Sequence, residues 1–166
     1  VFRFEGEQTV EHWDNIQPRR GPNTSGHSMV DGPTEVTDLE LTETNRTFVR
    51  RFVTEVLMAR HLDRLGQFVN EDSFTQHNAD LRDGSDSLRI ALEQTVDGQP
   101  VVVYTQVHRV LAEGNFVLAA SEGEWRGVHS ASYDLFRIAD GKIVEHWDTV
   151  EAIAPRSEWK HDNGKF

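Results

Sequence analysis

The spacing of hydrophobic positions changes once along the chain, near Gly98. Before it, apolar residues recur at three- and four-residue intervals over about 44–59, more briefly over 62–69, and again after Gly84. This spacing gathers them on one side of a helix and therefore predicts three amphipathic helices. Residues 73–78, between the second and third helices, are predicted to be short and extended.

After Gly98 the pattern becomes that of β-strands. Four runs rich in β-branched and aromatic residues are separated by short segments that contain glycine, and they cover about 101–111, 115–125, 128–138 and 142–151. The Asp140-Gly141 pair between the last two runs is a strong signal for a tight hairpin turn. Helices followed by a meander of antiparallel strands predict an α+β fold, in which a curved sheet wraps around helices and can enclose a pocket.

The first residues of the chain repeat a pattern found near its end. Residues 2–14 match residues 136–148 without a gap, and the match includes the five consecutive identities Val-Glu-His-Trp-Asp. Residues 18–42 are rich in Pro, Gly, Ser, Thr and Asp, as in a long linker. We therefore expect residues 1–42 to be a tail and linker that copies the final hairpin, and residues 43–166 to form the domain. In this interpretation the chain begins inside the final hairpin of an upstream copy.

Composition and charge exclude several classes of function. The 28 acidic residues outnumber the 17 basic ones, and the formal charge of −11 opposes binding to nucleic acid, which needs a basic surface. No stretch approaches the roughly 18 consecutive apolar residues of a membrane span, and the N-terminus lacks the pattern of a signal peptide. The absence of cysteine excludes disulfides and thiolate metal sites. We expect a cytoplasmic protein that binds neither nucleic acid nor a membrane.

Two polar residues of the last predicted strand are the main candidates for chemistry. Counting back from the turn pairs Leu135 with His146 and Tyr133 with Asp148. Because side chains alternate along a strand, these four residues are expected on one face, which His129 extends by two pleats. The opposite face would then carry Asp134, Phe136, Ile138, Ile143, Glu145 and Trp147. An error of one residue in this register would exchange the two faces.

A histidine and an aspartate two residues apart on one face can act as an acid/base pair. Burial raises the pKa of a carboxylate, and an imidazole titrates near neutral pH, so His146 and Asp148 suit proton transfer. The structural alternative makes His146 a hydrogen-bonded core residue and Asp148 the partner of an arginine. His77, on the short extended segment, is a weaker candidate. A metal site from His129, His146 and Asp148 has no further ligand pattern to support it, so we predict no metal site.

Several segments together resemble one known family. They are residues 52–57, 76–78, 107–110 and 133–137 and, most specifically, Glu145-His146-Trp147-Asp148. These residues resemble the SnoaL-like polyketide cyclases of the nuclear-transport-factor-like superfamily, which also contains ketosteroid isomerases, scytalone dehydratases and limonene epoxide hydrolases. The resemblance implies a cone-shaped, cystatin-like α+β barrel around about three N-terminal helices. It also implies a homodimer formed through the outer face of the sheet, and no metal or organic cofactor.

The resemblance further implies cofactor-independent acid/base chemistry on a small hydrophobic substrate in an enclosed pocket. The reactions of this group are aldol cyclisation, isomerisation, dehydration and epoxide hydration, and a pocket aspartate acts as their acid or base. Asp148 best matches that aspartate, with His146 as the second catalytic candidate. The candidates for substrate binding are His77, His129, Tyr133 and Leu135. Two alternatives stay open: a noncatalytic protein that binds a small apolar ligand, and a partner-binding scaffold whose pocket is filled.

Overall fold

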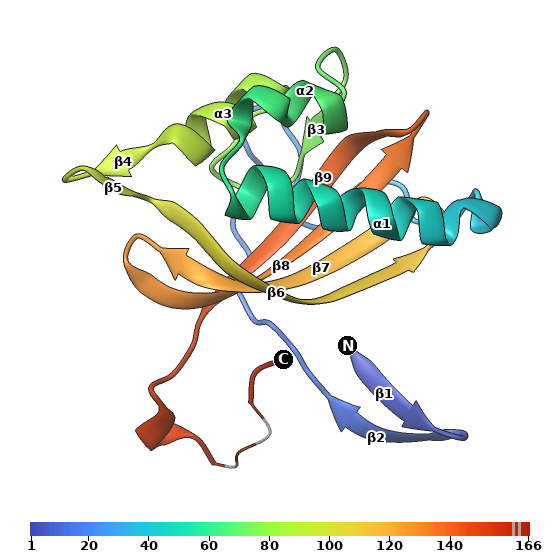
Figure 1. Cartoon of the computed structure of the whole chain (residues 1–166), viewed down its shortest axis with the longest axis vertical. Coiled ribbons are helices and arrows are strands. Elements are labelled where there is room, and N and C mark those ends of the chain that lie inside the picture. The colour runs from blue at the N-terminus through green and yellow to red at the C-terminus, as the bar shows by residue number, and fades with distance from the viewer. Residues whose placement is uncertain (161, 163) are drawn as a thin grey trace.

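A curved sheet with helices on one face forms the main body of the computed structural model, which describes residues 1–160, 162 and 164–166 (Figure 1). The strand order is β3-β9-β8-β7-β6. The long strands are antiparallel, and the short β3 joins the edge of β9 in parallel. Their bounds are β3 Thr75–Gln76, β6 Val102–Glu113, β7 Phe116–Trp125, β8 Val128–Ala139 and β9 Lys142–Ala152. The α+β class and the four long strands confirm the prediction.

The helices that come before the long strands cover one face of the sheet, which we call the inner face (Figure 1). They are η1 Leu39–Leu41, α1 Thr42–Phe52, a π-helical continuation η2 Val53–Met58, η3 Leu62–Arg64, α2 Leu65–Phe68 and α3 Ser85–Glu93. These helices confirm the three predicted helical regions. At the centre of the core, the ring of Phe52 packs edge-on against Phe136 of β8 with 5.5 Å between ring centroids. Burying such a side chain contributes about 1.5–3 kcal/mol to folding.

The N-terminal hairpin, β1 Phe2–Glu5 and β2 Gln8–His12, stands apart from the main sheet (Figure 1). Residues 13–37, which we call the strap, connect it to the helices across the outer face. Trp13 lies over Arg109 of β6, Asn23 donates a hydrogen bond to the carbonyl of Gln76 in β3, and Thr37 binds Asn115 in the β6–β7 turn. Three short elements complete the chain: β4 Thr95–Val96, β5 Gln99–Pro100 and η4 Arg156–Glu158. Within the described residues, no helix has the length and apolar character needed to cross a membrane.

The last hairpin contains the predicted tight turn but not the predicted register. Asp140 and Gly141 both have positive φ angles, 50° and 70°, and Ala139 pairs with Lys142. The pairing then shifts by one residue, because Val144 is an extra residue that leaves a β-bulge. Beyond the bulge the pairs are Phe136 with His146, Leu135 with Trp147, Asp134 with Asp148 and Tyr133 with Thr149.

Because of the bulge, His146 and Asp148 pair with residues other than the predicted ones. The predicted pairing of Leu135 with His146 and of Tyr133 with Asp148 is wrong. His146 and Asp148 share the inner face with Asp134 and Phe136, because directly opposed residues of an antiparallel pair point to the same side. Tyr133 and Leu135 lie on the outer face instead, together with Thr149 and Trp147.

Candidate active site

His146 is buried on the inner face, and both of its ring nitrogens have partners. Nδ1 lies 3.0 Å from Oε1 of Gln76, and Nε2 lies 3.1 Å from Oδ1 of Asp134. The Gln76 oxygen also accepts hydrogen bonds from the backbone N–H groups of His77 and Asn78. Because that oxygen can only accept, the Nδ1 atom of His146 carries a hydrogen and donates it. Gln76 therefore fixes both the orientation and the protonation of one side of the imidazole.

Asp134 connects His146 to a tyrosine on another strand. Asp134 is buried, and its Oδ1 atom also accepts a hydrogen bond of 3.2 Å from the Tyr104 hydroxyl. Burial, followed by the charges of Asp134 and Asp148, raises the pKa of Tyr104 well above its ordinary value. Tyr104 is therefore a neutral hydrogen-bond donor in the physiological pH range.

Electrostatics around His146 favour its charged form. Burial alone lowers the pKa of His146, but the hydrogen bond to Asp134 and the charges of Asp148 and Asp134 outweigh burial and raise it. A raised imidazole pKa increases the share of molecules in which both ring nitrogens carry hydrogens at neutral pH. The arrangement thus favours a cationic imidazole beside the carboxyl groups of Asp134 and Asp148.

Asp148, like Asp134, has only one oxygen bound, but the hydrogen bond of Asp148 comes from the neutral amide of Asn78 and not from His146 or Tyr104. Asn78 donates a 2.7 Å hydrogen bond to Oδ2, whereas the buried Oδ1 atom has no hydrogen-bond partner among the described residues. Burial raises the pKa of Asp148, and the charge of Asp134 adds to this, while the charge of His146 and the Asn78 hydrogen bond oppose it only in part. Asp148 is therefore a carboxyl group with an available oxygen and an increased affinity for a proton.

Two further buried atoms of this cluster lack partners within the described residues, namely Nε2 of Gln76 and Oδ2 of Asp134. A buried polar atom without a partner costs about 1–3 kcal/mol. Such atoms mark a position where a polar group of another molecule would be bound favourably.

Among the residues that the structure describes, two clusters have donor atoms close enough to hold a metal ion. One comprises Asp134, His146 and Asp148, and the other His27, Asp31 and His77; within each, one ligand atom per residue lies within 4.8 Å of the others. The trio considered from the sequence, His129 with His146 and Asp148, is not brought together. His129 lies on the outer face, with Nε2 2.6 Å from a carboxylate oxygen of Glu122.

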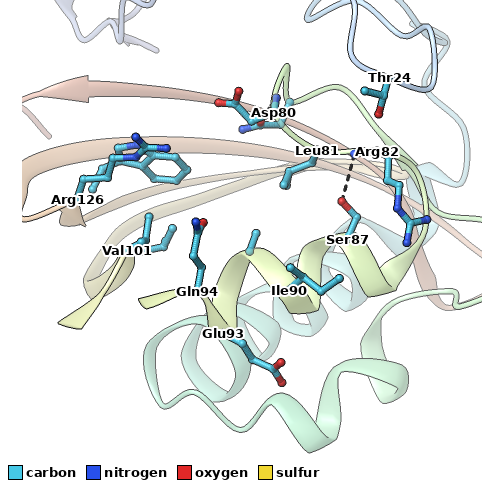
Figure 2. Close-up of a pocket in the computed structure, with 14 residues that line it drawn as sticks. Thr24, Asp80, Leu81, Arg82, Ser87, Ile90, Glu93, Gln94, Val101 and Arg126 are labelled. Carbon is cyan, nitrogen blue, oxygen red and sulfur yellow. Dashed lines mark hydrogen bonds between the residues drawn. The ribbon is translucent and has the colours of Figure 1, made fainter. Parts of the chain in front are cut away.

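A pocket of about 570 Å³ opens between α3 and the strands (Figure 2). Ser87, Ile90 and Gln94 line its helix side, and Val101 and Arg126 line its strand side (Figure 2). Its apolar lining also includes Leu81, Ala91, Val102 and Trp125. A second pocket of about 350 Å³ shares four lining residues with the first, namely Asn78, Asp80, Trp125 and Arg126.

Asn78 connects these pockets to the buried cluster. It lines both pockets, and its amide donates to Asp148, whereas Asp134, His146 and Asp148 are not part of either wall. The reactive groups therefore lie one residue behind the pocket surface.

His77 lies outside this site, contrary to its predicted role in substrate binding. Alternation along β3 points Gln76 inward and His77 outward. The His77 ring stacks on Trp147 with 4.5 Å between centroids, and Nε2 lies 2.8 Å from Oε1 of Glu145. Its Nδ1 faces the backbone oxygen of Ser28 in the strap at 2.8 Å.

The other three predicted substrate-binding residues also lie on the outer face. His129, Tyr133 and Leu135 occupy alternate positions of β8, and the bulge places that set opposite Trp147 and Thr149 instead of His146 and Asp148. The prediction that these residues lie beside His146 and Asp148 was therefore wrong, because the pairing of β8 with β9 is shifted by one residue. The juxtaposition of His146 and Asp148 on one face does occur.

Four residues of the cluster were missing from the sequence-based site list: Gln76, Asn78, Tyr104 and Asp134. Gln76 and Asn78 are the sequence neighbours of His77. Because side chains alternate between the two faces of a strand, placing His77 on the outer face would have placed both neighbours on the inner face. Asp134 could be placed on the face of His146 only once the β-bulge at Val144 was known. Tyr104 reaches the site from β6, 30 residues away from Asp134, and no local pattern indicates that contact.

A family profile described as a SnoaL-like domain matches residues 49–146. The chain belongs to the SnoaL-like domain family. This membership confirms the family resemblance of the sequence. The match runs from the second half of α1 to His146 in β9 and ends two residues before Asp148. No match was found for this SnoaL-like chain among curated proteins.

Solved structures share the SnoaL-like fold at low sequence identity. A candidate ketosteroid isomerase from Kribbella flavida is 17% identical and covers 75% of this chain and 94% of its own, with a TM-score of 0.58. A candidate SnoaL-like polyketide cyclase from Jannaschia is 19% identical over 72% and 92%, with a TM-score of 0.52. An LEH-like epoxide hydrolase from M. tuberculosis is 18% identical over 66% and 84%, with a TM-score of 0.51. At these identities the likeness shows the fold of the SnoaL-like chain.

Proposed function

We propose that this SnoaL-like chain is an enzyme that transfers protons on a hydrophobic carbonyl compound without a cofactor, with Asp148 as the base. The observation that carries the proposal is the state of Asp148. One of its oxygens is buried and unpartnered among the described residues, its pKa is raised, and its single hydrogen bond comes from an amide. A general base needs a free oxygen and a pKa nearer the working pH than that of an ordinary carboxyl group; the free oxygen is present, and burial raises the Asp148 pKa in that direction.

In the proposed reaction, Oδ1 of Asp148 removes a proton from the carbon next to the substrate carbonyl. The electron pair of the broken C–H bond forms a C=C bond, and the carbonyl oxygen becomes an enolate oxygen. The unpartnered N–H group of Gln76 is a buried donor available to that oxygen. Asp148 then returns the proton to another carbon, or to a leaving oxygen, which completes an isomerisation or an elimination.

His146 acts on this reaction through charge and through position. Its raised pKa favours an imidazolium, whose positive charge stabilises both the Asp148 carboxylate and the developing enolate. Asp134, held by Tyr104, and Gln76 keep the ring in place from its two nitrogens. We assign Asp134, Tyr104 and Gln76 as positioning residues, with Gln76 also a candidate oxyanion donor.

The chemistry of the pocket indicates the class of substrate. Leu81, Val101, Val102 and Trp125 provide an apolar wall, and Arg82, Arg126 and Asp80 add charges around it. A volume of about 570 Å³ is within the range of small-molecule sites. We propose a largely apolar carbon skeleton that carries a carbonyl group toward Asn78. The family's epoxide chemistry would use the same base, with Asp148 removing a proton from an attacking water.

The direct test is deuterium exchange at the substrate. A panel of cyclic and aromatic ketones is incubated with the protein in D₂O, and incorporation next to the carbonyl is followed by NMR. We expect exchange above the buffer rate, and a decrease of about 10²–10⁴-fold in Asp148→Asn. Asp72→Asn, which changes an exposed aspartate outside the pockets, is the matched control and should exchange like the parent protein.

Two results would overturn the proposal. Equal exchange rates for Asp148→Asn and the parent protein would exclude Asp148 as the base. Saturable ketone binding by both proteins, without exchange by either and without epoxide hydration, would instead identify a noncatalytic binding protein. Binding is measured by calorimetry on the same panel, so that the two results are distinguished.

A further inference from the structure

The hairpin β1–β2 repeats the end of β8–β9 in its strand pairing. Phe2 pairs with His12, Arg3 with Glu11, Phe4 with Thr9 and Glu5 with Gln8. The corresponding pairs of the main sheet are Phe136 with His146, Arg137 with Glu145, Ile138 with Ile143 and Ala139 with Lys142. Both hairpins carry the bulge at the same step, between Arg3 and Phe4 and between Arg137 and Ile138. The similarity therefore includes an irregular feature that short hairpins do not need.

Side-chain contacts are repeated as well. The rings of Phe2 and His12 stack with 4.4 Å between centroids, as those of Phe136 and His146 do at 4.9 Å. Nε of Arg3 donates to Oε2 of Glu11 at 2.6 Å, the same atoms that join Arg137 and Glu145 at 2.7 Å. The N-terminal hairpin thus has the geometry of the last hairpin of a SnoaL-like sheet.

What the N-terminal hairpin lacks is the rest of such a domain. Phe2 is 57% exposed and Phe4 60%, whereas Phe136 and Ile138, at the same positions of the repeat, are 2% and 4% exposed. Val10 is 41% exposed and its counterpart Val144 9%. In the main sheet, Phe136 packs against Phe52 of α1 and Ile138 belongs to the same buried core, while β8 and β9 pair at their outer edges with β7 and β3. The hairpin presents the same apolar face and the same two edges to solvent.

We propose that β1–β2 is the terminal hairpin of a second SnoaL-like domain that precedes residue 1 in the same polypeptide, and that this domain covers the face formed by Phe2 and Phe4. The fit is specific, because the occupant must supply an apolar helix, a strand for the edge of β1 and a short parallel strand for the edge of β2. The part of a SnoaL-like fold that precedes its last hairpin supplies all three.

The contacts of the strap support the placement of this domain in the same polypeptide. Immediately after the hairpin, Trp13 lies over Arg109, and Asn15 donates to the carbonyl oxygens of Ala131 and Thr149. The side chain of Gln17 then accepts a hydrogen bond from the backbone of Val150. The chain that leaves the hairpin is therefore fixed to the outer face of the following domain within a few residues.

Hydrogen–deuterium exchange tests the proposal on two proteins, the 166-residue chain and the polypeptide expressed from its complete natural gene. We expect the natural polypeptide to carry about 100 further residues before Val1, with helices followed by strands, as over 39–135 here. The amides of β1 and β2 should exchange at least about 100-fold more slowly in it than in the 166-residue chain, and those of β7 equally in both. Equal exchange of the hairpin amides, or a natural polypeptide without such a domain, would overturn the proposal.

A surface variant tests the contact itself. Phe4→Lys should leave the thermal midpoint of the 166-residue chain unchanged, since Phe4 is exposed there. In the natural polypeptide it should lower the midpoint of the preceding domain by about 4–8 °C. Glu7→Lys, in the hairpin turn, is the control and should change neither. If light scattering instead shows that the 166-residue chain dimerises and that only Phe4→Lys dissociates it, the hairpin binds a second copy and the proposal is wrong.

Discussion

Burial opposes the ionisation of Asp148. The protonation state of this residue is therefore linked to the stability of the fold. A carboxyl group whose pKa is raised by folding binds its proton more tightly in the folded state than in the unfolded state. Its favourable contribution to folding is complete below the ordinary pKa of an aspartate and is lost as the pH rises through the raised pKa. At neutral pH the ionised Asp148 therefore destabilises the fold.

Asp148→Asn should consequently raise the thermal midpoint at neutral pH while it removes the proposed base. The amide retains an oxygen that can accept from Asn78 and carries no charge. The gain should diminish as the pH falls below the raised pKa, because the parent carboxyl is then protonated as well. Circular dichroism melts from pH 4 to pH 8 measure this, with Asp72→Asn as the control. A lower midpoint for Asp148→Asn at neutral pH would show that the charge is stabilising instead.

The same variant should also change the titration of His146. The charge of Asp148 is one of the causes that raise the His146 pKa, so its removal should shift that pKa downward. NMR spectra of histidine-labelled protein, recorded against pH, resolve the imidazole directly. Asp72→Asn should leave the His146 titration unchanged. An unaltered His146 titration in Asp148→Asn would mean that the two groups are not coupled.

At the scale of elements, the Asp140-Gly141 turn fixes the pairing from which the site follows. Gly141 has a φ of 70°, and a Cβ atom there would meet no heavy atom within 4 Å. Gly141→Ala therefore introduces backbone strain without a clash and should lower the free energy of unfolding by about 1 kcal/mol. Urea unfolding measures the change. Gly21→Ala, at a glycine without positive φ and with open space around it, should have no such effect.

The sequence predicted these elements because each is encoded locally. Helical periodicity gave the region of α1 and η2, and the Asp-Gly pair gave the turn between β8 and β9. The bulge at Val144 has no such signal. Both faces of the last hairpin carry bulky apolar side chains, such as Leu135 on the outer face and Phe136 on the inner face. Alternation alone could not select the inner face, and Tyr133 and Leu135 were wrongly placed on the same face as His146.

The polar partners of His146 depend on contacts between distant segments. Gln76 comes from a two-residue strand and Tyr104 from β6, and each reaches the site only through the curvature of the sheet. Propensity and spacing describe single segments, so they could place His146 and Asp148 together but not supply the residues that bind them.

At the scale of the whole molecule, the strap binds the domain close to the site. Asn23 is buried; its amide group donates to the Gln76 carbonyl at 2.6 Å, and its Oδ1 atom accepts from the backbone of Ser25 and His27. The strap therefore supports the strand that orients His146. It also occupies part of the outer face through which a homodimer was expected, and that homodimer stays a prediction.

Asn23→Ala should loosen the strap and disturb the site together. The loss of these hydrogen bonds should lower the free energy of unfolding by about 1–3 kcal/mol, measured by urea unfolding. The exchange activity proposed for Asp148 should fall as well, because β3 carries Gln76. Thr34→Ala, at an exposed strap position, is the control. A destabilised Asn23→Ala with unchanged activity would show that the strap supports the fold but not the chemistry.

The repeat separates the residues of the site into two groups, one inside the repeated stretch and one upstream of it. His12 and Asp14 stand at the positions of His146 and Asp148 within one continuous stretch of 13 residues, while Gln76, Asn78 and Tyr104 lie far upstream of the second stretch. Recombination at the turn between β7 and β8 would therefore transfer His146 and Asp148 together with Asp134, but without Gln76, Asn78 and Tyr104. The recipient would keep its own residues at those three positions, so a duplicated domain can inherit the histidine and the aspartates and evolve a different proton affinity.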